Sequence, residues 1–198
     1  MDGRAPLEAN GKARLSISEY LEWSAIREGK HEFHEGQVFA IPAAKVIHNI
    51  IAVNVLGFLT VRLRNKPFLV FGSDQRIHIP SHAFFTYPDI TVVWGGAAMS
   101  PDDDRSVLNP CLLVEVSSPP TREYDREQKF GLYRDIPSLR EYVLIDSAGV
   151  GVETWRHDGK GHWEPEAFKT IGNMISMPVL GMDLSLSEIY EGTYLAVN

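Results

Sequence analysis

Residues 111–117 read Cys-Leu-Leu-Val-Glu-Val-Ser, and residues 87–94 read Tyr-Pro-Asp-Ile-Thr-Val-Val-Trp. Near-continuous apolar runs of this length predict two buried strands. Pro88 cannot donate a ladder hydrogen bond and belongs at a strand start, so Asp89 lies at a strand end. Glu115 interrupts the other run, where a carboxylate is costly to bury unless it is paired or binds a metal ion. We therefore expect Asp89 and Glu115 to meet at one edge of a sheet and to bind a divalent cation.

Each acid also has a simpler explanation. Asp89 by itself fits a turn or capping residue, and Glu115 fits a structural ion pair. Because side chains alternate along a strand, Glu115 shares a face with Leu113 and Ser117. The two strands alone leave these alternatives open.

A helix over residues 121–134 is expected directly after the strand at 111–117, because two prolines end that strand and Thr121 can cap the next helix. Asp125, Lys129 and Tyr133 are spaced i, i+4 and i+8, so they fall along one face of this helix. The alternative is an exposed ion pair between Asp125 and Lys129. The short connection to the strand favours a lysine that reaches the carboxylates.

Caps, turns and periodicity predict the remaining elements. Ser16-Ile17-Ser18-Glu19 fits a capping box at the start of a helix that stops at Gly29. Glu35-Gly36 is a turn between two short strands within residues 31–41. The other expected elements are a core helix over 46–64, strands over 68–71, 75–79 and 142–146, a polar surface loop over 95–110, a hairpin with strands 151–156 and 162–169, and a short helix over 184–190.

These elements predict a mixed α/β (α+β) fold with a mixed β-sheet flanked by helices, an N-terminal helix and hairpin, and a C-terminal β-hairpin. Residues 16–198 are expected to form one domain, and residues 1–15 a mobile N-terminus.

Composition limits the function classes. The 198 residues carry 19 Lys and Arg against 26 Asp and Glu, a net charge of −7, which argues against a constitutive, non-specific nucleic-acid binder. Cys111 is the only cysteine, so no disulfide framework exists and a reducing cytoplasm is the expected location. Residues 1–14 lack the apolar core of a signal peptide. Residues 46–63 are marginal in length for a membrane span and fit a core helix better, so no membrane partner is expected.

The ordered set of motifs resembles the PD-(D/E)XK nuclease superfamily, and more closely the bacterial Uma-type family of restriction-endonuclease-like proteins. The match runs from about Ser16 to Arg156. The residues that carry it are Glu32, Glu35-Gly36, His48, Pro88-Asp89, Glu115-Val116-Ser117-Ser118, Thr121-Arg122, Asp125-Arg126, Lys129 and Tyr133. The resemblance implies a restriction-endonuclease-like fold, Mg²⁺ or Mn²⁺ as cofactor, and hydrolysis of phosphodiester bonds in nucleic acid, with DNA as the expected substrate and a homodimer as a further expectation.

The resemblance also implies roles for individual residues. Asp89 and Glu115 would hold the metal ion. The superfamily has its lysine two residues after the glutamate, where this chain has Ser117, so the resemblance implies that the lysine role has moved to Lys129. Glu32 is a fourth candidate catalytic residue, although the histidines around it depart from the family pattern. The candidate substrate-binding residues are Arg122, Arg126 and His48.

Two other functions remain open. One is a non-catalytic interaction or assembly module on the same fold, which the net charge of −7 favours somewhat. The other is a metal-dependent hydrolase of a small phosphorylated substrate, for which an acidic surface is no obstacle.

Overall fold

Two six-stranded β-sheets organise the computed structural model, which describes residues 5–9 and 11–197. Neighbouring strands of the central sheet run antiparallel, except that β9 and β10 run parallel. In spatial order the strands of this sheet are β12 (Trp163–Phe168), β11 (Val152–His157), β10 (Glu141–Asp146), β9 (Pro110–Ser117), β6 (Ile90–Trp94) and β3 (Phe68–Gly72). All eight residues of β9 are buried, as its apolar sequence predicts.

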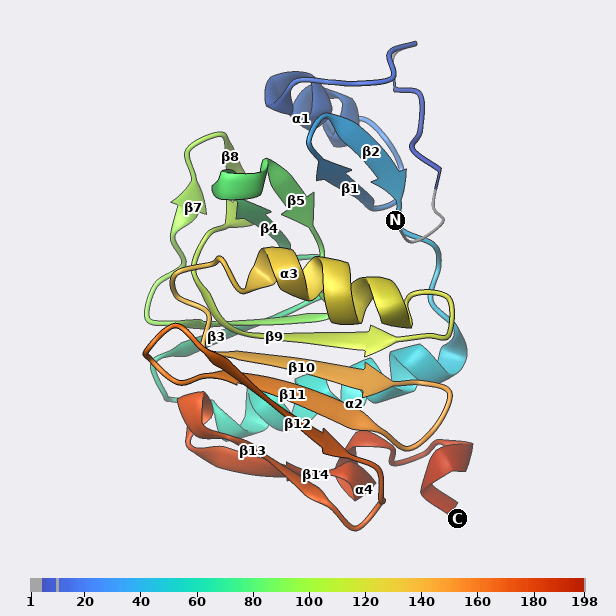
Figure 1. Cartoon of the computed structure of the whole chain (residues 1–198), viewed down its shortest axis with the longest axis vertical. Coiled ribbons are helices and arrows are strands. Elements are labelled where there is room, and N and C mark those ends of the chain that lie inside the picture. Colours follow the sequence, from blue (N-terminus) through green and yellow to red (C-terminus); the bar gives the residue numbers. More distant parts are fainter. Residues whose placement is uncertain (1–4, 10, 198) are drawn as a thin grey trace.

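The second sheet lies beside the central sheet, next to the N-terminal helix α1 (Ile17–Ala25), as Figure 1 shows. In spatial order its strands are β2 (Gln37–Ala40), β1 (His31–His34), β5 (Phe84–Thr86), β4 (Arg76–Ile79), β8 (Asp103–Val107) and β7 (Met99–Ser100). The fold is therefore mixed α+β, as expected, with two large sheets flanked by helices.

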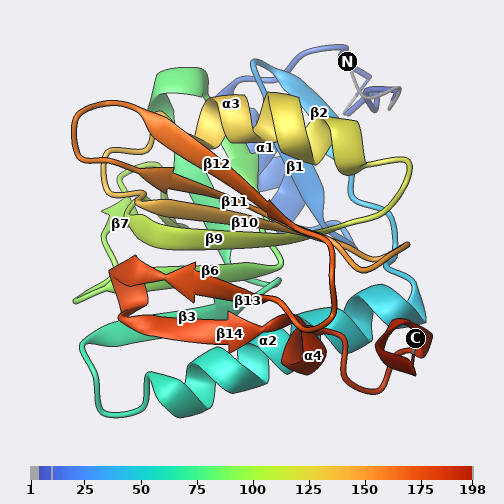
Figure 2. The same ribbon diagram turned by 60° about the horizontal axis from the view of Figure 1, so that its bottom comes forward.

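Helices cover the central sheet on both faces (Figures 1 and 2). One face packs against α2 (Val46–Arg62), the hairpin of β13 (Met174–Met177) and β14 (Met182–Ser185), and α4 (Leu186–Ile189). The other face packs against a π-helical segment (Tyr124–Lys129) that continues into α3 (Phe130–Tyr133). A π-helical turn is rare and occurs often at functional sites.

Local signals placed several boundaries correctly. Ser16 and Glu19 form the predicted capping box at the start of α1. The predicted turn at Glu35-Gly36 joins β1 to β2, and both residues have positive φ, 47° and 90°, which suits a tight hairpin turn.

The expected surface loop over residues 95–110 was wrong, because it contains β7 and β8. Arg76 of β4 is buried and its Nη2 lies 2.5 Å from Asp103 Oδ2. This ion pair helps to hold Asp103, which belongs to the acidic run Asp102-Asp103-Asp104, in the second sheet. It is a long-range contact that the local polarity of the loop could not reveal. The β13–β14 hairpin was also missed.

The segment before α1 contacts the second sheet. Leu7 donates its N–H to Val38 O at 2.8 Å, and Ala9 and Leu15 are buried. Residues 1–4 and 10, which belong to the expected mobile N-terminus, lie outside the described residues. The mobility of residues 1–15 and the assignment of residues 16–198 to one domain stay predictions.

No helix in the described part of the chain is long and apolar enough to cross a lipid bilayer.

Candidate active site

Strands β6 and β9 bring the two acids together. They pair antiparallel with Ile90 opposite Val114, and this register places Asp89, one residue before β6, opposite Glu115. Residues directly opposite in antiparallel strands project from the same face. Asp89 and Glu115 accordingly line one cavity of about 310 Å³.

Lys129 reaches the same cavity from the π-helical segment. Its Nζ lies 2.9 Å from Glu115 Oε1, 3.1 Å from Glu32 Oε1 and 3.9 Å from Asp125 Oδ1. The lysine is only 6% exposed. Its side chain therefore occupies the position that the relocated-lysine hypothesis requires, while its chemical role stays a prediction.

Glu32 enters the site from β1 in the second sheet. Its side chain is 1% exposed, and it accepts hydrogen bonds from the Thr86 hydroxyl and, at 3.1 Å, from the Tyr124 hydroxyl. The hairpin register places Glu32 opposite Phe39. The third candidate acid is thus held by residues from two separate segments, β5 and the π-helical segment.

His48, on the first turn of α2, contacts Asp89. Its Nε2 lies 3.2 Å from Asp89 Oδ2, which also accepts the Val116 N–H at 2.8 Å. Burial by itself lowers the pKa of His48, but the hydrogen bond and negative charge of Asp89 outweigh burial and leave the pKa raised. His48 therefore fixes the orientation of Asp89 in this structure; a contact with substrate stays a prediction.

The electrostatics of the site follow from burial of charge. Burial raises the pKa of Glu115 to about 8, with Asp89 and Asp125 contributing in the same direction and Lys129 opposing them. Burial also raises the pKa of Asp125. For Lys129, burial alone would lower the pKa, but Glu115 and Glu32 hold it well above its ordinary value. The cavity thus combines a permanently protonated lysine with crowded carboxylates that a cation would stabilise.

The donor set fits a hard divalent cation. No group of three His, Cys, Asp or Glu side chains in the described residues is arranged to hold a metal ion alone. Mg²⁺, however, is usually bound by one or two carboxylates together with water and substrate phosphate. The protein contacts described above engage Asp89 Oδ2 and Glu115 Oε1, and no hydrogen bond from a described residue reaches Asp89 Oδ1 or Glu115 Oε2. These two oxygens are the ones that suit a metal ion.

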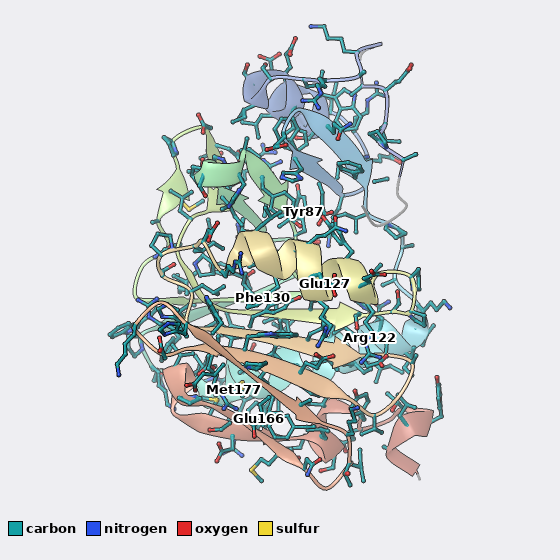
Figure 3. All side chains as sticks on the ribbon, viewed as in Figure 1. Tyr87, Arg122, Glu127, Phe130, Glu166 and Met177 are labelled. Atoms are coloured by element: carbon teal, nitrogen blue, oxygen red, sulfur yellow. The ribbon has the colours of Figure 1, made fainter. Side chains whose placement is uncertain are left out.

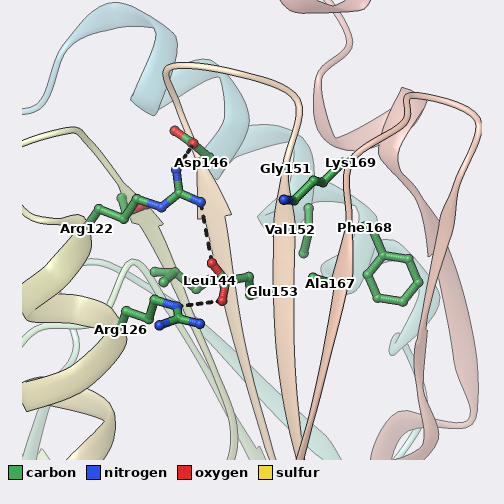
Figure 4. Close-up of a pocket in the computed structure, with 11 residues that line it drawn as sticks. Arg122, Arg126, Leu144, Asp146, Gly151, Val152, Glu153, Ala167, Phe168 and Lys169 are labelled. Atoms are coloured by element: carbon green, nitrogen blue, oxygen red, sulfur yellow. Dashed lines mark hydrogen bonds and ion pairs between the residues drawn. The ribbon is translucent and has the colours of Figure 1, made fainter.

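Arg122 and Arg126 are not brought to this cavity. They line a smaller one of about 180 Å³ beside β10 and β11, shown in Figure 4. Arg122 Nη1 lies 2.6 Å from Asp146 Oδ2, and Arg126 Nε lies 2.7 Å from Glu153 Oε2. Figure 3 shows Arg122 and Tyr87 on opposite sides of the helix that carries Lys129. Binding of flanking phosphates by the two arginines stays a prediction, and it would require them to leave these carboxylates.

Several residues that shape the site were not among the candidate site residues, although Asp125 and Tyr133 were expected on the helix face of Lys129. Tyr133 donates its hydroxyl to Glu115 Oε1 at 2.7 Å, and Asp125 lines the cavity. The i, i+4, i+8 spacing with Lys129 was a usable signal for both. Thr86 and Tyr124 carry no such signal, because their contact with Glu32 joins segments far apart in the chain.

Comparison with known proteins agrees with this architecture. A crystal structure from Anabaena variabilis, described as "a putative nuclease belonging to DUF820", superposes with a TM-score of 0.69 over 89% of this chain and 97% of the other, at 18% identity. Two uncharacterised Synechocystis proteins are similar in sequence. The protein slr1290 is 30% identical over 182 residues, which are 90% of this chain and 93% of the relative. The protein sll1609 is 33% identical over 149 residues, which are 75% and 84% of the two chains. The model of the Uma2 family, described as "Putative restriction endonuclease", matches residues 17–188, so the chain belongs to the Uma2 family.

Proposed function

We propose that this protein hydrolyses phosphodiester bonds of nucleic acid in the cavity between β6, β9 and the π-helical segment. One observation carries the proposal: the ammonium of Lys129 lies 2.9 Å from Glu115 in the cavity that Asp89 also lines. Membership of the Uma2 family supports a nuclease.

Each residue has a separate role in the proposed reaction. Asp89 and Glu115 would hold Mg²⁺ or Mn²⁺, which supplies a Lewis acid and a bound water of lowered pKa. Lys129 stays protonated and donates hydrogen bonds to negative charge that develops on the phosphate oxygens. His48 and Tyr133 hold the two acids in orientation through the contacts described above.

Three further features belong to this proposal. DNA is the expected substrate, the cytoplasm the expected location and a homodimer the expected assembly. The dimer is supported by β3, an edge strand of the central sheet that carries no charge or proline and exposes Leu69. Such an edge is open to pairing with a second strand.

Cleavage assays on matched variants test the proposal. Purified wild-type protein with Mn²⁺ should cut nucleic acid, and Glu115→Gln and Asp89→Asn should each lose at least about 100-fold in rate, as for removal of a group that stabilises the transition state. Asp183→Asn is the control, since Asp183 is an exposed acid on β14. Equal rates in all four proteins would place the activity elsewhere. No cleavage by wild type on any nucleic acid would favour the non-catalytic module.

A further inference from the structure

The cavity is small and its reactive groups lie deep. Its volume of about 310 Å³ is at the lower end of the range of small-ligand sites, about 300–1,000 Å³. Glu115 is 5% exposed. A phosphate must therefore enter the protein to reach Glu115 and Lys129, and cannot react while it stays outside the surface.

Two short segments form the rim of the cavity. Residues 42–45, just before α2, are exposed, and Ser118, Pro120 and Thr121, which also line the cavity, follow β9. Both segments connect to elements that are anchored in the core. A phosphate in the interior of a duplex is tied to a sugar whose base is stacked and paired. Enzymes that act inside such a pocket take an unpaired nucleotide or first pull one out of the stack.

The charges at the cavity disfavour a duplex as well. Four carboxylates line it against two lysines, and Lys129 is buried among three of those carboxylates. Lys45, on the rim, is the exposed one of the two. Duplex binders make many phosphate contacts with Lys and Arg on a strongly positive face. The net charge of −7 offers no such compensation.

Aromatic side chains line the same cavity. Tyr87 lies next to the Pro88-Asp89 strand start, and Tyr124 precedes Asp125 in the π-helical segment. Base–aromatic stacking tolerates any sequence, because every base has a π-face. An unpaired nucleotide thus has a surface for its base and a lysine for its phosphate.

From this geometry, and resting on the phosphodiesterase function proposed above, we infer that the substrate is an unpaired nucleotide of a single strand, an overhang or an end, and not the interior of a duplex. In the reaction, water oxygen bonds to phosphorus and one P–O ester bond breaks. The products are a phosphomonoester and an alcohol: the attacking water releases one proton to the solvent, and the departing oxygen takes up one proton from the solvent.

The first experiment compares three labelled substrates of one sequence with Mn²⁺: a single strand, a blunt duplex and the duplex with a single-stranded overhang. We expect cleavage in the single strand and the overhang, at least about 100-fold faster than inside the duplex, since unstacking must precede entry. Equal or faster cleavage inside the duplex would overturn the inference and leave the phosphodiesterase function intact.

Binding provides a readout that does not depend on catalysis. Fluorescence anisotropy in Ca²⁺ should show tighter binding of the single strand than of the duplex. Tyr87→Leu should weaken single-strand binding by about 5- to 160-fold, the range expected for loss of one stacked base. Trp94→Leu is the matched control, because Trp94 is 67% exposed at the far end of β6, the strand that follows Tyr87. If none of the three substrates is cleaved with Mn²⁺, the proposed cleavage function is wrong. A single-strand preference that depends on Tyr87 then still supports the inference, and its absence overturns it.

Salt dependence gives a second check. With one exposed lysine at the rim, the logarithm of the association constant should fall with the logarithm of salt concentration with a slope of about −0.7, since each phosphate contact on a single strand contributes about −0.7. Lys45→Ala should flatten the slope, whereas Lys66→Ala, at an exposed site before β3, should not change it. A slope several times steeper, unaffected by Lys45→Ala, would show a different binding face.

Discussion

Replacing Lys129 with methionine should destabilise the protein severely. Sequence alone predicts a lysine on the wall of a cleft, whose loss leaves folding largely intact. The structure reverses that expectation, because the ammonium is buried between Glu115, Glu32 and Asp125. Methionine fills a similar volume but leaves three carboxylates without their shared cation.

The size of the destabilisation depends on the burial of Lys129 and its three carboxylate partners. Removing one partner of a buried ion pair costs about 3–5 kcal/mol, because an uncompensated buried charge remains. For a domain of this length, 1 kcal/mol shifts the melting temperature by about 2–4 °C. We therefore expect Lys129→Met to melt roughly 6–20 °C below wild type at pH 8 in EDTA.

The difference in melting temperature between wild type and Lys129→Met should shrink at lower pH. In wild type, burial raises the pKa values of Glu115 and Asp125, and Lys129 lowers both. Without the lysine both pKa values rise further, so the folded variant takes up protons at a higher pH than folded wild type, and the stability difference between them shrinks as pH falls through that range. The Lys129 ammonium of wild type does not titrate in this window, because its pKa is raised.

Thermal denaturation followed by circular dichroism at pH 5 and pH 8 measures both effects. Lys66→Met is the matched control, since an exposed substitution usually changes stability by less than about 0.5 kcal/mol. If Lys129→Met melts at the same temperature as the control at pH 8, or if its melting temperature falls further below that of wild type as pH falls, Lys129 does not stabilise the buried carboxylates.

Three further outcomes are expected. Burial raises the pKa of Glu141 to about 7, so the stabilising contribution of this side chain is present below pH 4.5 and is lost as pH rises through 7. Glu141→Gln keeps an acceptor for the Val179 N–H and should be more stable than wild type by roughly 3 kcal/mol at pH 8 but equal to it at pH 4. A urea titration that shows the same difference at both pH values would contradict this. Mg²⁺ or Mn²⁺ at 100 times its dissociation constant should stabilise wild type by about 2.7 kcal/mol but leave Asp89→Asn unchanged in a thermal-shift assay, and an equal shift in both would move the metal away from Asp89. Tyr133→Phe removes the hydroxyl that donates to Glu115 and should cost about 1–3 kcal/mol in urea denaturation, whereas an unchanged midpoint would show that this hydrogen bond adds nothing.

Local chemistry made part of the fold predictable. The Ser16 cap, the Glu35-Gly36 turn and the apolar run of β9 depend on neighbours in the chain, and each lies where its pattern indicated. The strands β7 and β8 were not predictable in this way. Their sequence is polar, and part of what holds β8 in the sheet is the pairing of Asp103 with Arg76, 27 residues away.

Asp89 begins one apolar run and Glu115 interrupts another, so the amino-acid pattern alone indicates that both carboxylates require partners wherever their strands lie. That the two runs form neighbouring strands, and which partners the carboxylates have, follows from the tertiary structure. It brought Glu32 from another sheet to Lys129, set His48 against Asp89, and turned Arg122 away to Asp146. These choices depend on how distant segments pack against one another, and the spacing of residues along the chain carries no information about that packing.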